Sequence, residues 1–271
     1  MGQEALEVLS SESASGVTLE IVQYPALRGS GDLAVAERVF FANQADIRLK
    51  HIRARLDKGE IQIEPGALYY MRGQLQLEAS TQGVKKGFMR SFLSGETLFQ
   101  SKIRGSGEVY LDPSFGHFVM FNIDNDALIV DKGAFYCASG GLEVSAVLQG
   151  NVSSALFGGE GFFQTIIRGS GAVVLVAPVP LEEMVTYELA AGEKLFVDGN
   201  FAFMRTASIT FRAEKSAKSL FRSLVSGEGL LQTFEGPGIV WIAPTQGIYD
   251  ELRTQGLSSH TGGSMGTKVN T

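Results

Sequence analysis

One sequence pattern occurs three times in this chain. The copies are SGETLFQSKIRGSGEVYLDP from Ser94, GGEGFFQTIIRGSGAVVLVAP from Gly158 and SGEGLLQTFEGPGIVWIAP from Ser226. Each has Gly-Glu, a Gln four residues after the Glu, a Gly-x-Gly, an apolar run and a closing Pro. Similarity at a regular spacing is typical of repeat architectures. A residue that recurs in all three copies is therefore better explained by the structure of the unit than by catalysis.

A second pattern repeats in step with the first, upstream of it. Its copies are IQIEPGALYYMRGQLQLEA from Ile61, ALIVDKGAFYCASGGLEVSA from Ala127 and KLFVDGNFAFMRTASITFRA from Lys194. Glu64 and Asp131 are as far apart in the sequence as Asp131 and Asp198, and we call this interval the repeat period. Two residues after each acidic position come Gly66, Gly133 and Asn200. Gly and Asn tolerate a positive φ, so the pattern predicts a tight turn in every copy.

The fold class follows from the distribution of glycine and apolar residues. The chain is 44% hydrophobic and has 33 glycines, most of them between apolar runs. Alternation such as Val17, Leu19, Ile21 is typical of strands, and the runs AVVLVAP and GIVWIAP indicate strands buried on both faces. Helical patterns are limited to two short stretches, Leu33–Phe41 and Ile248–Arg253. The sequence predicts an all-β protein made of three repeated β-sandwich units.

The repeats divide the chain into five segments. Residues 1–47 are expected to hold an N-terminal strand and a connection that packs on the repeats. The three repeats are predicted at 48–113, 114–178 and 179–244. Residues 245–271, which end in a Gly/Ser/Thr-rich stretch, are predicted to be a largely disordered tail.

Charge and cysteine content restrict the environment and the partners. The single Cys137 allows no disulfide within the chain, which suits a reducing compartment. The sequence shows no signal peptide and no apolar run of about 18 residues. We therefore expect a cytoplasmic protein. A net charge of −6 disfavours nucleic acid. The basic run IRLKHIRARL from Ile47 is interpreted as an exposed edge strand that its charges protect from aggregation.

No catalytic, metal-binding or cofactor-binding motif is present, and we expect no enzyme activity, no metal and no cofactor. The RGSG stretches at Arg104 and Arg168 are interpreted as hairpin turns rather than phosphate loops. Cys137 stands where the other copies have Tyr70 and Met204, which indicates a packing role. The recurring acids and amides are expected to be structural, bonding turn backbone or a neighbouring copy: Glu96, Glu160, Glu228, Gln100, Gln164 and Gln232.

Two segments before the Gly-Glu motif combine basic and apolar side chains. They contain Lys85, Lys86, Phe88, Arg90 and Phe92 in the first copy, and Lys218, Phe221 and Arg222 in the third. One interpretation is a surface that binds a protein partner or an anionic membrane. The other is that the apolar side chains are buried within an oligomer. Both remain open at this point.

The threefold order of these motifs resembles the altered-inheritance-of-mitochondria family of mitochondrial biogenesis proteins, over about Arg48 to Pro244. That resemblance implies a fold similar to the tryptophan RNA-binding attenuation protein, with three units about a pseudo-threefold axis. It carries no catalytic residues. It is consistent with a non-catalytic assembly protein that associates with itself, and the resemblance implies a homotrimer. The alternatives are a ring that binds a small molecule or RNA between units, and a peripheral membrane factor.

Overall fold

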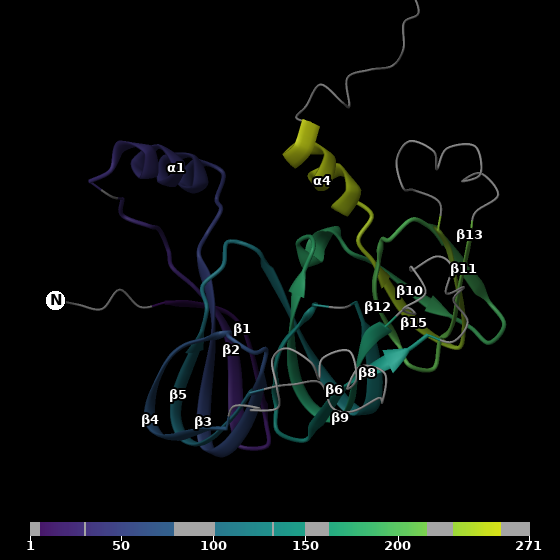
Figure 1. Cartoon of the computed structure of the whole chain (residues 1–271), viewed down its shortest axis with the longest axis horizontal. Coiled ribbons are helices and arrows are strands. Elements are labelled where there is room, and N and C mark those ends of the chain that lie inside the picture. The colour runs from purple at the N-terminus through teal and green to yellow at the C-terminus, as the bar shows by residue number, and fades with distance from the viewer. Residues whose placement is uncertain are drawn as a thin grey trace, which may run out of the picture.

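The computed structural model describes residues 6–29, 31–78, 101–131, 133–149, 163–215 and 230–255 (Figure 1). This part of the chain is mostly β-structure in large antiparallel sheets, as the sequence predicts. The strands are β1 (Glu7–Ala14), β2 (Val17–Gln23), β3 (Lys50–Ile63), β4 (Leu68–Glu78), β5 (Ser101–Leu111), β6 (His117–Val130), β7 (Phe135–Ser139), β8 (Leu142–Leu148), β9 (Phe163–Ala177), β10 (Val185–Leu189), β11 (Lys194–Asp198), β12 (Ala202–Thr206), β13 (Thr210–Lys215), β14 (Leu230–Glu235) and β15 (Gly238–Ile242). The helices are α1 (Leu33–Gln44), the short 3-10 helix η2 (Leu181–Glu183) and α4 (Gln246–Gln255).

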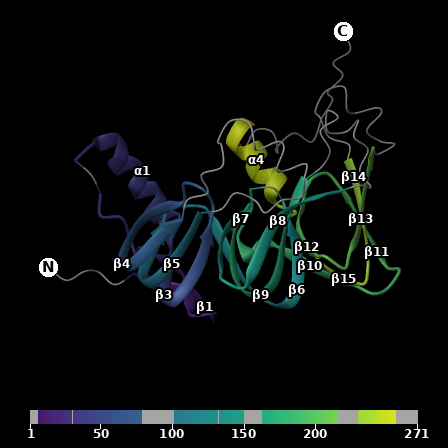
Figure 2. The same cartoon turned by 60° about the horizontal axis from the view of Figure 1, so that its bottom comes forward.

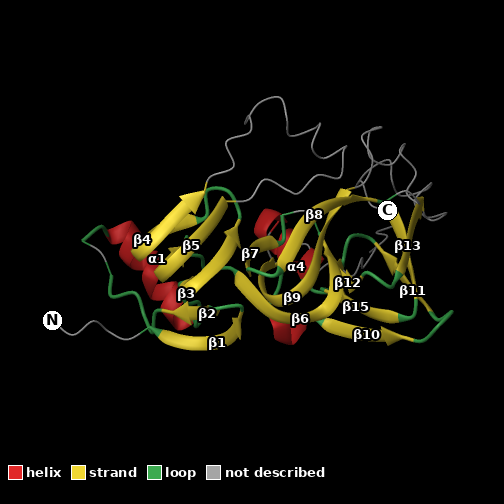
Figure 3. Ribbon diagram, turned by 90° about the horizontal axis from the view of Figure 1, so that it is seen from below, coloured by secondary structure: helices red, strands yellow, loops and turns green. Residues whose placement is uncertain are grey.

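The strands after α1 fall into three consecutive groups. We call β3–β5 the first group, β6–β9 the second and β10–β15 the third. Hydrogen bonding links them in the order β1-β2-β3-β7-β9-β6-β12-β15-β10, and β11-β14-β13 forms a separate sheet. The groups lie in a row along the long axis of the molecule, with β4 at one end and β11 at the other (Figures 1, 2 and 3). The strand pairing of the described residues does not place the three groups around one common axis.

Strand register recurs from group to group. A one-residue bulge follows the first paired residue of β4, β7 and β12, at Leu68, Phe135 and Ala202, each one repeat period after the one before. The pairing between groups also recurs. β3 meets β7 at Ile61↔Ser139, and β6 meets β12 at Leu128↔Thr206, again one repeat period further along both strands.

Each of the first two hydrophobic cores is completed by side chains of the following group. The first core, formed by β2, β3 and β5, also contains Tyr136, Cys137, Ala172 and Val174. The second core also contains Phe203 and Met204, which are two residues of β12. The third core, around Phe234, draws its buried members from the third group only. Neighbouring groups therefore share apolar surface as well as backbone hydrogen bonds.

The N-terminal segment lies against the basic strand β3. It forms a hairpin of two strands, β1 and β2, and β2 pairs along Lys50–Leu56 of β3. Because β5 pairs with the other edge of β3, this basic strand is interior and not an exposed edge. Its charges have partners on β2: Arg53 Nε donates to Glu20 at 2.6 Å. The expected short helices are present as α1 and α4, and α4 occupies residues that the sequence assigned to the tail.

The RGSG stretches are not hairpin turns, which corrects the sequence interpretation. Both lie inside long strands, β5 and β9, at the register shifts opposite β3 and β6. Gly105 has φ +129° and Gly169 has φ +118°. A Cβ at Gly105 would overlap the carbonyl oxygen of Gln74, and one at Gly169 the carbonyl oxygen of Gly141. Glycine is required because two strands approach closely at a kink.

The repeated turn is present in two copies as expected and shifted in the third. Gly66 and Gly133 have φ +89° and +85°. In both turns the following residue donates its N–H to the acidic residue's carbonyl oxygen at 3.1 Å, as Ala67 does to Glu64. In the third copy the positive φ of +109° falls on Gly199, so the prediction for Asn200 is wrong by one residue.

Candidate functional site

The most unusual polar arrangement joins the second group to the third. Asp131 follows β6, Gln164 lies on β9 and Arg205 lies on β12. Gln164 Nε2 donates to Asp131 Oδ1 at 3.2 Å, and Arg205 Nη1 donates to Gln164 Oε1 at 2.7 Å. Gln164 and Arg205 are 6% and 2% exposed. The amide thus bridges a half-buried carboxylate and a buried guanidinium.

Burial dominates the electrostatics of this chain of three. It raises the pKa of Asp131 to about 6, against the opposing effects of the Gln164 hydrogen bond and the Arg205 charge. Burial also lowers the pKa of Arg205 to about 10, although the charge of Asp131 acts in the other direction. The Arg205 Cζ lies 4.6 Å from the centre of the Phe211 ring, a cation–π geometry. Arg205 Nε has no hydrogen-bond partner among the described residues, so the cation is incompletely satisfied.

The recurring glutamines contact the recurring turn wherever the structure describes them. Gln164 bonds Asp131 of the second turn, and Gln232 Nε2 donates to Asn200 Oδ1 of the third at 3.2 Å. Both glutamines are buried. Outside the described residues lie Glu96, Glu160, Glu228 and Gln100, and also Lys85, Lys86, Phe88, Arg90, Phe92, Lys218, Phe221 and Arg222 of the basic-apolar segments.

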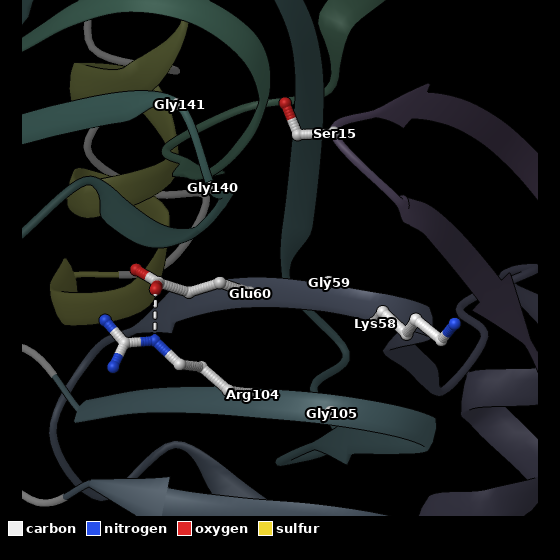
Figure 4. Close-up of a pocket in the computed structure, with 8 residues that line it drawn as sticks. All are labelled: Ser15, Lys58, Gly59, Glu60, Arg104, Gly105, Gly140 and Gly141. Atoms are coloured by element: carbon white, nitrogen blue, oxygen red, sulfur yellow. Dashed lines mark hydrogen bonds and ion pairs between the residues drawn. The ribbon is translucent and has the colours of Figure 1, made fainter.

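An open pocket of about 580 Å³ lies where the first and second groups meet the N-terminal hairpin (Figure 4). Its lining residues come from the β1–β2 turn, β3, β5 and the β7–β8 turn: Ser15, Lys58, Gly59, Glu60, Arg104, Gly105, Gly140 and Gly141. The Lys58 amine points away from the ion pair between Glu60 and Arg104. The pocket therefore offers polar groups and exposed backbone at a junction between groups.

The carboxylate in this pocket is already engaged by cations. Arg104 Nε contacts Glu60 Oε2, Lys102 Nζ lies 3.1 Å from Glu60 Oε1, and Arg104 Nη1 lies 2.8 Å from Glu78 Oε1. Burial acts to raise the pKa of Glu60, but the hydrogen bonds from Arg104 and Lys102 prevail and lower it. Glu60 is held as a carboxylate, an acceptor and counter-ion.

Metal-ligating residues do not cluster in the part of the chain that the structure describes, where no three His, Cys, Asp or Glu residues gather. His51 is buried and its Nδ1 lies 3.0 Å from the carbonyl oxygen of Leu111. Cys137 is fully buried, and burial raises the pKa of its thiol. Among the described helices, none combines the length and apolar character needed to cross a membrane.

Sequence reasoning overlooked Arg205, although a signal was present. Arg205 stands one repeat period after Ala138, and Ala138 stands one repeat period after Met71. A lone cation at a position that is apolar in the other copies indicates a buried charge with a specific partner. That partner, Gln164, had itself been selected as a recurring residue.

Comparison with known proteins identifies the family of this chain. An uncharacterized protein of Streptococcus pyogenes serotype M6 is 23% identical over 201 residues, covering 68% of this chain and 76% of that protein. The crystal structure of another Streptococcus pyogenes protein matches with a TM-score of 0.57 at 19% identity, covering 76% of this chain and 94% of that one, which supports the fold. The model of the Mitochondrial biogenesis AIM24 family matches residues 41–245. The chain belongs to the mitochondrial biogenesis AIM24 family.

Proposed function

We propose that the protein is a non-catalytic assembly protein whose chain of three repeated β-sandwich units builds a β-rich homo-oligomeric ring. The repeat is supported by the register of the strands. The same bulge and the same pairing between groups return after one repeat period, which independent domains would have no reason to do. Repeat arrays of this kind act mainly through the surfaces they present.

The observation that carries the proposal is apolar surface on the strands at both ends of the row. At one end, Tyr69 and Tyr70 of β4 are 58% and 48% exposed. At the other end, Phe196 of β11 is 59% exposed. Exposed aromatic side chains along strand edges favour further pairing, which proteins otherwise prevent with charge or cover. Association between copies would bury this surface.

Light scattering coupled to size exclusion tests the proposal. We expect the mass of at least two 29.1 kDa chains at micromolar concentrations. The family resemblance favours three copies, and closed cyclic symmetry is the usual solution for homo-oligomers. A mass of one chain at all these concentrations would remove the proposal. A cytoplasmic location and the absence of enzyme activity are further parts of it.

A second candidate function is the binding of a small polar molecule between units, and the pocket in Figure 4 favours it. Native mass spectrometry of protein purified from cells would show extra mass that disappears on denaturation. A Ser15→Trp variant, which places a ring at the pocket, should lose that mass. Ser11→Trp, on the exposed face of β1, is the matched control. An unchanged native mass in the wild-type protein would argue against a tightly held ligand.

A further inference from the structure

We propose that a second copy of this chain adds head to tail, with β11 of one copy pairing antiparallel with β4 of the next. The register would be the one that already joins the groups within the chain. This inference rests on the proposed assembly function and names the surface that performs it. Three independent features support it: a recurring joint, two exposed edges that continue its pattern, and an incomplete core.

The joint occurs twice within the chain. β3 pairs with β7 from Ile61↔Ser139 to Ile63↔Cys137, and β6 pairs with β12 from Leu128↔Thr206 to Val130↔Met204. The side chains of both joints are all at most 8% exposed. In both joints the first strand of one group pairs with the strand that follows the turn of the next group, so the connection is directional.

At the same positions in the remaining copies, the described residues show no strand in the place of the joint's partner. One further period along the chain lie Leu195, Phe196 and Val197 of β11, and one period before the β7 residues lie Tyr70, Met71 and Arg72 of β4. Among the described residues β11 pairs only with β14, and β4 only with β5. Phe196, Tyr70 and Met71 are 59%, 48% and 37% exposed. Their counterparts Ile129, Cys137 and Ala138 are 6%, 0% and 0% exposed.

The hydrophobic cores point to the same partner. Tyr136 and Cys137 complete the first core, and Phe203 and Met204 complete the second. The corresponding residues of β4 are Tyr69 and Tyr70, and neither belongs to a hydrophobic core formed by the described residues. Instead their rings contact each other at 5.6 Å, and Tyr70 stacks on Tyr110 at 4.5 Å between centroids. Among the described residues, the third core has no such contribution from another group, and the tyrosine pair of a second copy would supply it.

A second copy, rather than the same chain, fits the arrangement of the two edges. β4 and β11 lie at opposite ends of the long axis, and the three views share that axis (Figures 1, 2 and 3). A contact of this kind uses different surfaces on the two partners. Such heterologous contacts close into a ring when the rotation per copy permits, and otherwise extend. The expected facing pair is Phe196 with Met71, by analogy with Ile129↔Arg205.

Disulfide crosslinking of two single variants tests this register. Met71→Cys and Phe196→Cys proteins, one carrying a tag of different mass, are mixed and oxidised. Facing residues of paired strands lie within disulfide distance, so the mixed dimer should exceed either homodimer by at least roughly tenfold. Phe41→Cys replaces Phe196→Cys in the control mixture, because Phe41 is 60% exposed and lies on α1 rather than on β4 or β11. The native Cys137 is buried and stays unreactive.

The outcomes separate this inference from the assembly proposal. An oligomeric wild-type protein without the mixed disulfide would overturn the head-to-tail register and leave assembly standing. A variant that carries both Met71→Cys and Phe196→Cys offers a further check. If its disulfide forms within single chains, the two edges meet in the same copy, and the proposed second copy is refuted. A wild-type mass of one chain would overturn both. Phe196→Glu should reduce the assembly mass while Phe41→Glu does not, with circular dichroism confirming that both variants are folded. Equal masses for these two variants would also overturn the inference.

Discussion

The kink at Gly105 gives the sharpest stability prediction, because a matched glycine is available for comparison. Gly133 has a positive φ, and a Cβ there would meet nothing within 4 Å. Gly133→Ala therefore causes no steric clash, and its only cost in the folded state is conformational, about 1–2 kcal/mol. Alanine also reduces the freedom of the unfolded chain, which offsets about 0.4–1 kcal/mol of that cost. We expect a net loss of about 1 kcal/mol. The bulkier Gly133→Val should cost about 1–3 kcal/mol.

Gly105, with φ +129°, gives alanine a conformational cost at least as large as at Gly133, and a steric cost in addition. Its Cβ would overlap the carbonyl oxygen of Gln74 and lie 3.2 Å from the Cα of Leu75, both on the paired strand β4. The strands must separate, which weakens the ladder on either side of the kink. Losing two or three net hydrogen bonds at about 1 kcal/mol each brings the total to about 3–4 kcal/mol.

Urea unfolding followed by fluorescence measures both variants. Trp241 is the single tryptophan and packs against the second core. Equal destabilisation by Gly105→Ala and Gly133→Ala would show that strand approach does not explain the glycine, and the kink argument would then fail.

Three further predictions concern buried polar groups. Burial raises the pKa of Asp131 from 3.8 to about 6, so the folded state binds the proton more tightly than the unfolded state does. Stability should therefore fall as the pH rises between these values, by at most about 3 kcal/mol. The urea midpoints of wild type and Asp131→Asn should diverge across this range. Arg205→Met removes one partner of a buried hydrogen-bonded chain and leaves Gln164 Oε1 and the Asp131 carboxylate without the cation, so a loss of about 3–5 kcal/mol is expected; a loss below about 1 kcal/mol in thermal unfolding would contradict this. Cys137 should resist a thiol reagent in native protein and react fully in urea, and equal rates in both would show that its burial is wrong.

The sequence predicted features that repeat and missed features that depend on pairing. The turns at Gly66 and Gly133 and the two short helices could be predicted because each has a local signature. The third turn differed because Gly199 precedes Asn200, and glycine takes positive φ more readily. The interior position of β3 was not predictable from its basic residues, since the partner that makes it interior is a distant N-terminal strand.

The candidate sites show the same division. The glutamines could be selected because recurrence is visible in one chain; the two that the structure describes contact side chains of the turn, whereas a bond to turn backbone or to a neighbouring copy was expected. Arg205 and the Glu60–Arg104 pair join different strands, and only the three-dimensional pairing brings them together with their partners. The RGSG stretches were assigned to turns because Gly-x-Gly usually marks a reversal, whereas in β5 and β9 it marks a kink.

The way the cores are completed has a consequence for biosynthesis. The first core needs Tyr136, Cys137, Ala172 and Val174, so the N-terminal strands emerge from the ribosome well before the residues that cover them. At about 5–20 residues per second, that apolar surface is uncovered for roughly 3–12 seconds after Leu111 is made. Each of the first two cores therefore stays incomplete until part of the following group has been synthesised. A nascent or truncated chain ending at Leu111 is then the form of this protein most in need of a chaperone.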